Sequence, residues 1–195
     1  WAQEGYLTEE EAEEWADGNT MDAIVSQKLG FDFNWYSTVH PNSHLFPPFE
    51  RKEIEQLPDG AMKVINDEGV VVLEKPGATS IPAEFEHTLK TRKDWEEQYV
   101  WRLQFDPDRI NQTMVRCNDK MIRFDEGGLE FLRDNERNYA LGLHCGSLFG
   151  NARNILGVVG ASYLFAEDPD LFDEIINTYG DLCFQCTKYL LETGA

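Results

Sequence analysis

Apolar residues recur at helical spacing over the last part of the chain, where they form one long stripe. Asp168 and Pro169 precede this stripe, and an aspartate N-cap followed by proline is typical of the first turn of a helix. Such a helix would bury its stripe against a core. The pattern therefore predicts one long helix whose buried face carries Leu171, Phe172, Ile175, Ile176, Tyr179, Leu182, Cys183, Cys186, Tyr189 and Leu190.

Before this stripe, a short apolar run gives way to small residues and then to helical spacing. Residues 139–143, Tyr-Ala-Leu-Gly-Leu, have the length and bulk of a buried strand. Ser147 is a good N-cap, and the apolar spacing after it continues to Gly157, which stops the helix. The pattern predicts a strand-turn-helix unit of an α/β fold. The residues at the end of that strand are His144, Cys145, Gly146 and Ser147.

Two short helices and a strand are predicted near the start of the sequence. Thr8 and Glu11 have the spacing of a capping box for a short acidic helix that extends to about Asp17. Residues 20–29 carry apolar positions at helical spacing, and Gly30 ends that helix. Residues 31–39 are rich in aromatic and β-branched side chains and predict a strand. The prolines that follow it predict a loop.

The middle of the chain changes to a pattern of antiparallel β-structure. The apolar runs 62–65 and 70–73 flank an Asn-Asp-Glu-Gly turn, which predicts a hairpin. Residues 91–94, Thr-Arg-Lys-Asp, predict the start of a helix, and another helix is predicted over 128–135. Residues 109–124 carry no pattern that assigns them to a helix or a strand.

The charge of the chain excludes some classes of partner. With 36 acidic and 17 basic residues, the net charge is −19, whereas nucleic-acid binding requires clustered lysine and arginine. The same charge disfavours anionic membrane surfaces, and no apolar run approaches the ~20 residues of a spanning helix. Four irregularly spaced cysteines fit reduced thiols better than a disulfide framework. We therefore expect a cytoplasmic protein that binds neither nucleic acid nor membrane.

Two residue pairs have spacings that occur in metal or redox sites. Cys183 and Cys186 form a C-x-x-C, which is typical of a redox pair or half of a zinc site. They lie on the apolar stripe of the last helix, so packing in the core is the preferred interpretation. His40 and His44 are four residues apart, but the intervening Pro41 places them in a loop. No metal site is expected within this sequence.

Several motifs, taken in order, resemble the uroporphyrinogen decarboxylase superfamily. The motifs are GSLFGNARNILG at 146–157, DPDLFDEIINTYGD at 168–181, IPAEFEHTLKTRKDWEE at 81–97 and KLGFDFNWYS at 28–37. The resemblance covers nearly the whole chain and is closest to a divergent branch that includes corrinoid-dependent methyltransferases. It implies an α/β fold, a partial (β/α)8 TIM barrel with a β-hairpin excursion at about 51–76.

The resemblance also implies a domain organisation. A (β/α)8 barrel typically needs about 250 residues, and this chain has 195. We therefore expect residues 1–195 to be the N-terminal or middle half of a single barrel domain, and hence a fragment of a longer enzyme. A complete small α/β domain is the alternative. Open strand edges would favour aggregation or an oligomer of such a fragment.

Matching the motifs to those of the family places the candidate site at the strand ends. True decarboxylases have an aspartate after the second strand, where this chain has Thr38, Val39 and His40, and a later tyrosine, near whose place Asn154 stands. Catalytic residues therefore stay unassigned. Arg153 is a candidate for binding a carboxylate, or is simply solvated. The pocket-lining candidates are Thr38, His40, His144, Cys145, Gly146, Ser147, Arg153 and Asn154.

The function that this resemblance implies is methyl transfer linked to a corrinoid protein. The decarboxylation of a tetrapyrrole, uroporphyrinogen to coproporphyrinogen, is the first alternative, and a noncatalytic interaction module is the second. The expected partner is accordingly a corrinoid protein or a tetrapyrrole-type small molecule. No cofactor is expected within the 195 residues; zinc and a corrinoid belong to the full-length protein if it is a methyltransferase.

Overall fold

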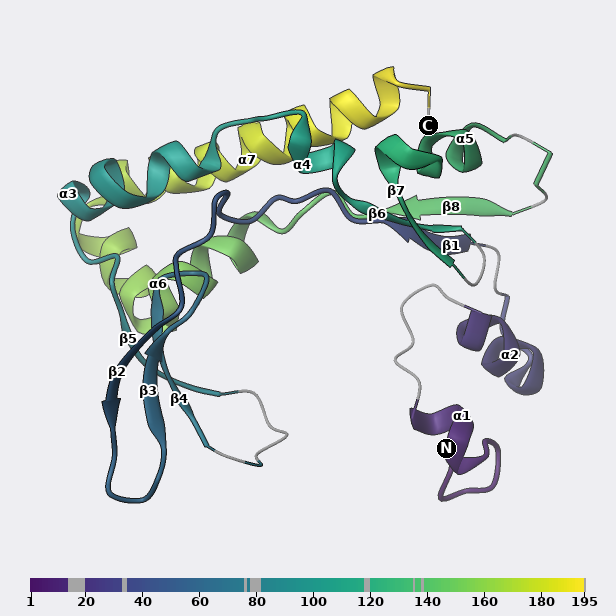
Figure 1. The fold of residues 1–195 in the computed structure, drawn as a ribbon, viewed down its shortest axis with the longest axis horizontal. Helices are drawn as coiled ribbons and strands as arrows, with labels where there is room; N and C mark the ends of the chain where they lie inside the picture. The colour runs from purple at the N-terminus through teal and green to yellow at the C-terminus, as the bar shows by residue number, and fades with distance from the viewer. Residues whose placement is uncertain are drawn as a thin grey trace. The chain divides into compact units, whose positions relative to one another are not determined.

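A computed structural model of the chain divides it into two compact units, each with its own sheet (Figure 1). The first unit comprises Trp1–Pro41, Ile110–Cys145 and Lys188–Ala195, and the second comprises Asn42–Arg109 and Gly146–Thr187. The structure describes residues 1–13, 20–32, 35–75, 77, 82–117, 120–134, 136–137 and 139–194. In that part of the chain, no helix has both the length and the apolar character needed to cross a membrane.

The first unit is built on a four-stranded sheet with the order β7-β6-β1-β8. β1 and β8 pair in parallel, with Trp35 opposite Ala140, and the other neighbours pair antiparallel. Val115 on β6 is completely buried, and Gly128 of α5 packs directly against its side chain. The strands are β1 (Trp35–Val39), β6 (Met114–Cys117), β7 (Lys120–Arg123) and β8 (Ala140–Leu143); the helices are α1 (Glu9–Glu13), α2 (Thr20–Leu29), η3 (Phe124–Glu126) and α5 (Gly128–Arg133).

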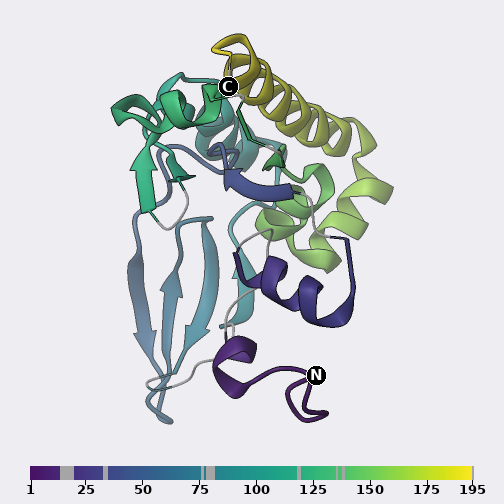
Figure 2. The same ribbon diagram turned by 90° about the vertical axis from the view of Figure 1, so that its right-hand side faces the viewer.

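The second unit contains an antiparallel meander in the order β2-β3-β4-β5, of which Figure 2 shows the first three strands side by side. The turn between β3 and β4 is held by Asn66, whose Oδ1 accepts hydrogen bonds from the backbone N–H groups of Glu68 and Val70. Val64, Val70 and Val72 form the core of this sheet. The strands are β2 (Lys52–Gln56), β3 (Met62–Ile65), β4 (Val70–Glu74) and β5 (Ala83–His87).

The helices of the second unit follow β5 and β8 in the chain. Thr91 and Asp94 form the predicted capping box at the start of a continuous helical segment. α6 is one helix with a break at Gly157, where φ is 70° and ψ is 164°. The elements are α3 (Arg92–Asp94), the π-helix η1 (Trp95–Tyr99), η2 (Val100–Leu103), α6 (Leu148–Glu167) and α7 (Pro169–Glu192). Two helices, α4 (Asp108–Asn111) and α7, contain residues of both units.

The expected (β/α)8 barrel is wrong. The described strands form two small, mostly antiparallel sheets of four strands, without a closed barrel and without a helix after each strand. β1 and β8 are a parallel pair, as the barrel required, but β6 pairs antiparallel on the other side of β1. The hairpin-rich segment from β2 to β5 makes a sheet of its own, so it is no excursion from a barrel.

Most local predictions are confirmed. The capping box of Thr8 and Glu11, the hairpin of β3 and β4, and the start of α7 at Asp168 all form as expected. β8 is also present, but it is an edge strand of the described sheet and is only partly buried. The unassigned segment 109–124 contains the β6–β7 hairpin. The predicted continuation of α1 beyond Glu13 lies outside the described residues.

Candidate functional site

Four of the eight predicted site residues belong to the first unit, where they lie at or just beyond the ends of the parallel strands β1 and β8. Thr38 is buried in β1, and its hydroxyl donates a hydrogen bond to the carbonyl of Gly142 on β8 at 3.2 Å. This bond links the two strands one residue before β1 ends. Thr38 therefore positions the strand ends and has no free hydroxyl proton for a ligand.

Beyond these strand ends, the imidazole rings of His40 and His144 stack on each other. Their centroids are 5.4 Å apart and their planes differ by 8°. Ser37 Oγ lies 2.9 Å from His40 Nε2 and orients that ring. The backbone N–H of His144 donates to the carbonyl of Val39 at 3.1 Å, which continues the parallel ladder up to the stacked pair. The sequence predicted both residues for the site, and the structure brings them together.

The residues around this pair do not fit a zinc ion. Two stacked, nearly parallel rings direct their nitrogens side by side, whereas zinc needs donors that converge tetrahedrally. Cys145 is exposed, and its thiol points to the carbonyl of Leu143. Across the described part of the chain, no group of three or more histidine, cysteine, aspartate or glutamate side chains could hold a metal ion. His40 and His44 lie in a loop, as the intervening proline predicted.

The other four predicted residues belong to the second unit. Gly146 has φ of 88° and packs against the Cys183 side chain, and Ser147 occupies the N-cap position of α6 without a side-chain hydrogen bond to the helix. Arg153 donates from its guanidinium to Asn154 Oδ1 at 2.7 Å, and Asn154 donates to Glu68 Oε1 at 3.3 Å. Four of the eight candidates thus belong to the first unit and four to the second.

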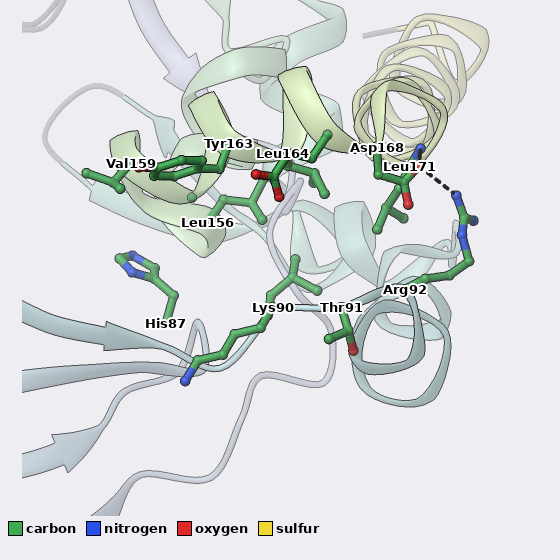
Figure 3. A pocket seen from close by; sticks show the side chains of 13 residues that line it. His87, Lys90, Thr91, Arg92, Leu156, Val159, Tyr163, Leu164, Asp168 and Leu171 are labelled. Carbon is green, nitrogen blue, oxygen red and sulfur yellow. Dashed lines mark hydrogen bonds and ion pairs between the residues drawn. The ribbon is translucent and has the colours of Figure 1, made fainter.

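The second unit also contains a cavity of about 600 Å³ that the sequence reasoning missed (Figure 3). One wall is the segment from the end of β5 to α3, and the other is the second half of α6 with the start of α7. Volumes of this size are typical of small-molecule sites. The residues that give the cavity its chemistry are His87, Lys90, Arg92, Tyr163, Glu167 and Asp168.

The α6 wall is one face of the helix. Positions 156, 159 or 160, 163 or 164, and 167 recur every three or four residues and therefore lie along one face of the helix. Val159 and Tyr163 remain 69% and 63% exposed, so their apolar surfaces are open along this face. Gly160 lies between them, and a Cβ there would meet nothing closer than 3.9 Å. The face forms a shallow groove with Gly160 as its floor.

His87 closes one end of the cavity. Its ring lies against the break in α6, where a Cβ on Gly157 would come within 2.6 Å of the imidazole Cε1. Nε2 is buried without a hydrogen bond among the described residues. Glu84 Oε2 is 3.5 Å away, which is an ion-pair distance if the ring is protonated but is not a hydrogen bond. Figure 3 shows the His87 ring pointing toward α6 and the Lys90 ammonium pointing away from it.

The basic side chains of the cavity are already paired with carboxylates. Lys90 bonds to Glu86, and this bond lowers the pKa of Glu86. Arg92 contacts Asp168 at 3.5 Å and Glu174 at 2.8 Å, and the bond to Glu174 raises the pKa of Arg92. Its partners therefore keep the guanidinium in place.

Glu167 differs from these groups because its carboxylate has neither an ion-pair nor a hydrogen-bond partner among the described side chains. The periodicity of 156, 159, 163 and 167 was present in the sequence as a signal for this wall. The cavity was missed because Gly157 was predicted to end the helix.

Comparison with models of protein families, with curated proteins and with solved structures gave no match to this chain.

Proposed function

We propose that this chain is a divergent member of the uroporphyrinogen decarboxylase superfamily that takes part in methyl transfer linked to a corrinoid protein. The closed barrel that the resemblance implied is no part of this proposal. Its main support is the pair of His40 and His144, stacked beyond the carboxyl ends of two parallel strands. Two of the motifs that carry the resemblance, 146–157 and 168–181, also lie on consecutive elements, the first half of the broken α6 and α7.

The chemistry of this pair fits proton transfer. When a thiol accepts a methyl group from a corrinoid, the bonding electron pair stays with the corrinoid and the thiol loses its proton. Histidine is the side chain that ordinarily exchanges protons near neutral pH. His40, oriented by Ser37 and stacked on His144, would take the proton of the acceptor. No zinc-dependent step is included, because the described residues do not fit a zinc site.

The proposed compartment is the cytoplasm, and the proposed partner is a corrinoid protein. All four cysteines are free, as expected where thiols are kept reduced. The net charge of −19 argues against nucleic acid and anionic membrane as partners.

The test is a demethylation assay with the 195-residue chain, free methylcobalamin and a small thiol, followed by the absorbance of the corrinoid. We expect a rate above the protein-free reaction that falls about a hundredfold in His40→Gln, the magnitude typical of a general base. His44→Gln is the matched control, because it removes an exposed loop histidine outside the stacked pair.

Two outcomes would overturn this function, and a third would overturn its proposed mechanism. Release of carbon dioxide from uroporphyrinogen, without demethylation, would assign the tetrapyrrole decarboxylase activity instead. Activity on neither substrate would favour the noncatalytic module. Equal loss of activity in His40→Gln and His44→Gln would remove the imidazole pair from the mechanism.

A further inference from the structure

One wall of the cavity in the second unit runs along the second half of α6, and a polar side chain lies near each end of this wall. His87 lies beside Gly157, at the start of the second half of α6, and Glu167 is the last residue of that helix. The helix rises by about 14 Å over the nine residues from Val158 to Glu167. Between them, the face consists of Val159, Gly160, Tyr163 and Leu164. A ligand that lies along this face and reaches both polar groups is therefore long and has an apolar middle.

The charges of the lining determine which ligand is favoured. Lys90 and Arg92 already have carboxylate partners, so an anionic ligand would have to displace an existing ion pair. Glu167 has none among the described side chains and belongs to the lining of the cavity. The chain as a whole carries −19 charges, which raises the local concentration of cations and lowers that of anions. The cavity is thus complementary to a positive charge at the Glu167 end.

The other end needs a hydrogen-bonding group. A buried polar atom without a partner is uncommon in a native structure, and it points to a ligand or a water at that place. His87 Nε2 is such an atom, and its ring faces the groove (Figure 3). The Tyr163 ring, which is exposed along the groove, adds an aromatic surface on which a cation or an aliphatic chain packs favourably.

We propose that this cavity binds an elongated amphipathic amine. Its ammonium group pairs with Glu167, its apolar chain lies along Val159, Gly160 and Tyr163, and a hydroxyl or carbonyl at its far end bonds to His87 Nε2. The site lies entirely within the second unit and does not depend on the methyl-transfer function proposed for the His40 and His144 pair.

The test is calorimetric titration of the full chain with four probes that each contain eight carbons: octylamine, 8-amino-1-octanol, octanol and octanoate. We expect octylamine to bind at least tenfold more tightly than octanol at low salt, and octanoate to bind most weakly. The amino alcohol should bind more tightly than octylamine. Shortening the alkylamine should weaken binding about fourfold for each methylene removed from the apolar contact.

Variants locate the binding within the groove. Glu167→Gln should reduce the preference for octylamine over octanol to within about twofold, whereas Glu130→Gln should leave it unchanged. Glu130 is the control because it is an exposed helical glutamate outside the cavity. His87→Phe keeps a ring against Gly157 and should abolish the advantage of the amino alcohol only.

Gly160→Leu fills the floor of the groove and should weaken all the amines more than tenfold. Its Cβ has free space and leucine favours helix over glycine, so this variant should fold. The amine site is overturned if octanoate binds more tightly than octylamine, if octylamine binds no more tightly than octanol, or if Gly160→Leu binds amines as the original chain does.

Discussion

The indole of Trp95 donates a hydrogen bond from Nε1 to Glu174 Oε1 at 2.9 Å, and this bond joins η1 to α7 within the second unit. Trp95 is completely buried, so the bond lies at the edge of the core. Arg92 donates to the other oxygen of the same carboxylate at 2.8 Å. The bond from Trp95, followed by the bond from Arg92, lowers the pKa of Glu174.

The lowered pKa of Glu174 predicts a pH dependence of stability. A carboxylate whose pKa is depressed by folding stabilises the protein above its unfolded pKa of about 4.3, and this contribution is lost as the pH falls through the folded value. Glu174→Gln should therefore lower the free energy of unfolding by about 1 kcal/mol at pH 7. The difference from the original chain should shrink as the pH falls through the lowered folded pKa of Glu174.

Urea unfolding at several pH values measures this difference. Trp95→Phe should lose a similar amount, because phenylalanine keeps most of the packing but removes the donor. Glu130 is an exposed glutamate for which the described residues provide no such contact, so Glu130→Gln should stay within about 0.5 kcal/mol of the original chain, as expected for surface changes. A Glu174→Gln effect that is the same at pH 7 and pH 3 would contradict the mechanism.

Arg109 stabilises the second unit by a different arrangement, in which a buried cation bonds only to backbone carbonyls. Its side chain is 1% exposed. Nε donates to Gln104 at 3.0 Å, and one terminal nitrogen donates to Asn42 at 2.9 Å and to His44 at 2.7 Å; the other donates to Arg102. Burial lowers the pKa of Arg109.

Arg109→Lys should destabilise the protein strongly although it keeps the charge. The lysine ammonium is a single point donor and does not reproduce the planar fork that reaches four carbonyls. Buried acceptors that lose their donors each cost about 1 to 3 kcal/mol, so we expect a loss of about 3 kcal/mol or more. Arg116→Lys, at an exposed position of β6, is the control for the exchange itself. Equal effects of the two substitutions in chemical unfolding would refute this role of Arg109.

Gly146 makes a close contact with Cys183 that predicts a steric effect of substitution. Its φ of 88° is costly for other residues, and a Cβ there would overlap the Cys183 sulfur. Gly60 has a similar φ of 82° with nothing within 4 Å of the added Cβ, so it isolates the backbone cost. Gly60→Ala should cost about 1 to 2 kcal/mol. Gly146→Ala should cost clearly more.

Removing the sulfur should restore the lost stability. In the double variant Gly146→Ala with Cys183→Ala, the sulfur clash disappears, and we expect the two effects to be non-additive by at least 1 kcal/mol, as is typical of residues in contact. Thermal and urea unfolding of the four proteins measure this coupling. Strict additivity would show that Gly146 is required for its backbone angle alone.

Local patterns in the sequence predicted elements well, but their pairing could not be derived from them. The hairpin of β3 and β4 and the capping boxes at Thr8 and Thr91 depend on residues close in sequence. The parallel pairing of β1 with β8 joins residues about 100 positions apart, and a parallel pair alone does not distinguish a barrel from a small mixed sheet. The antiparallel pairing of β6 with β1 is what distinguishes the small mixed sheet from a barrel. Residues 109–124, which contain β6, carry no pattern that predicts a strand.

The candidate site shows the same division between local and long-range information. His40 and His144 were predicted because each follows an apolar strand, and the parallel pairing then brings their rings into contact. Arg153 and Asn154 bond to each other in the second unit, whereas the stacked pair belongs to the first unit. The cavity beside His87 was missed because it depends on the contact of β5 with the helix beyond Gly157, which no local pattern encodes.

The four cysteines differ in accessibility in a way that their spacing does not reveal. Cys183 and Cys186 have the spacing of a redox pair, yet both are buried on the apolar face of α7 and are free thiols. Burial raises the pKa of Cys186 to about 11, and it also raises the pKa of Cys117. Cys145 is the exposed cysteine among the four. The core interpretation of the C-x-x-C is therefore confirmed.

Alkylation of the native protein with iodoacetamide at pH 8 should accordingly modify one thiol quickly. The thiolate is the reactive form, so Cys186, with its pKa of about 11, stays protonated and shielded until the chain unfolds. Peptide mass spectrometry should find the early label on Cys145, and Cys145→Ser should abolish the fast phase, whereas Cys117→Ser should retain it. Addition of urea above the unfolding midpoint should expose all four. Rapid labelling of Cys183 or Cys186 in the native protein would instead show that the α7 face opens readily, and would reinstate the C-x-x-C as a candidate redox pair.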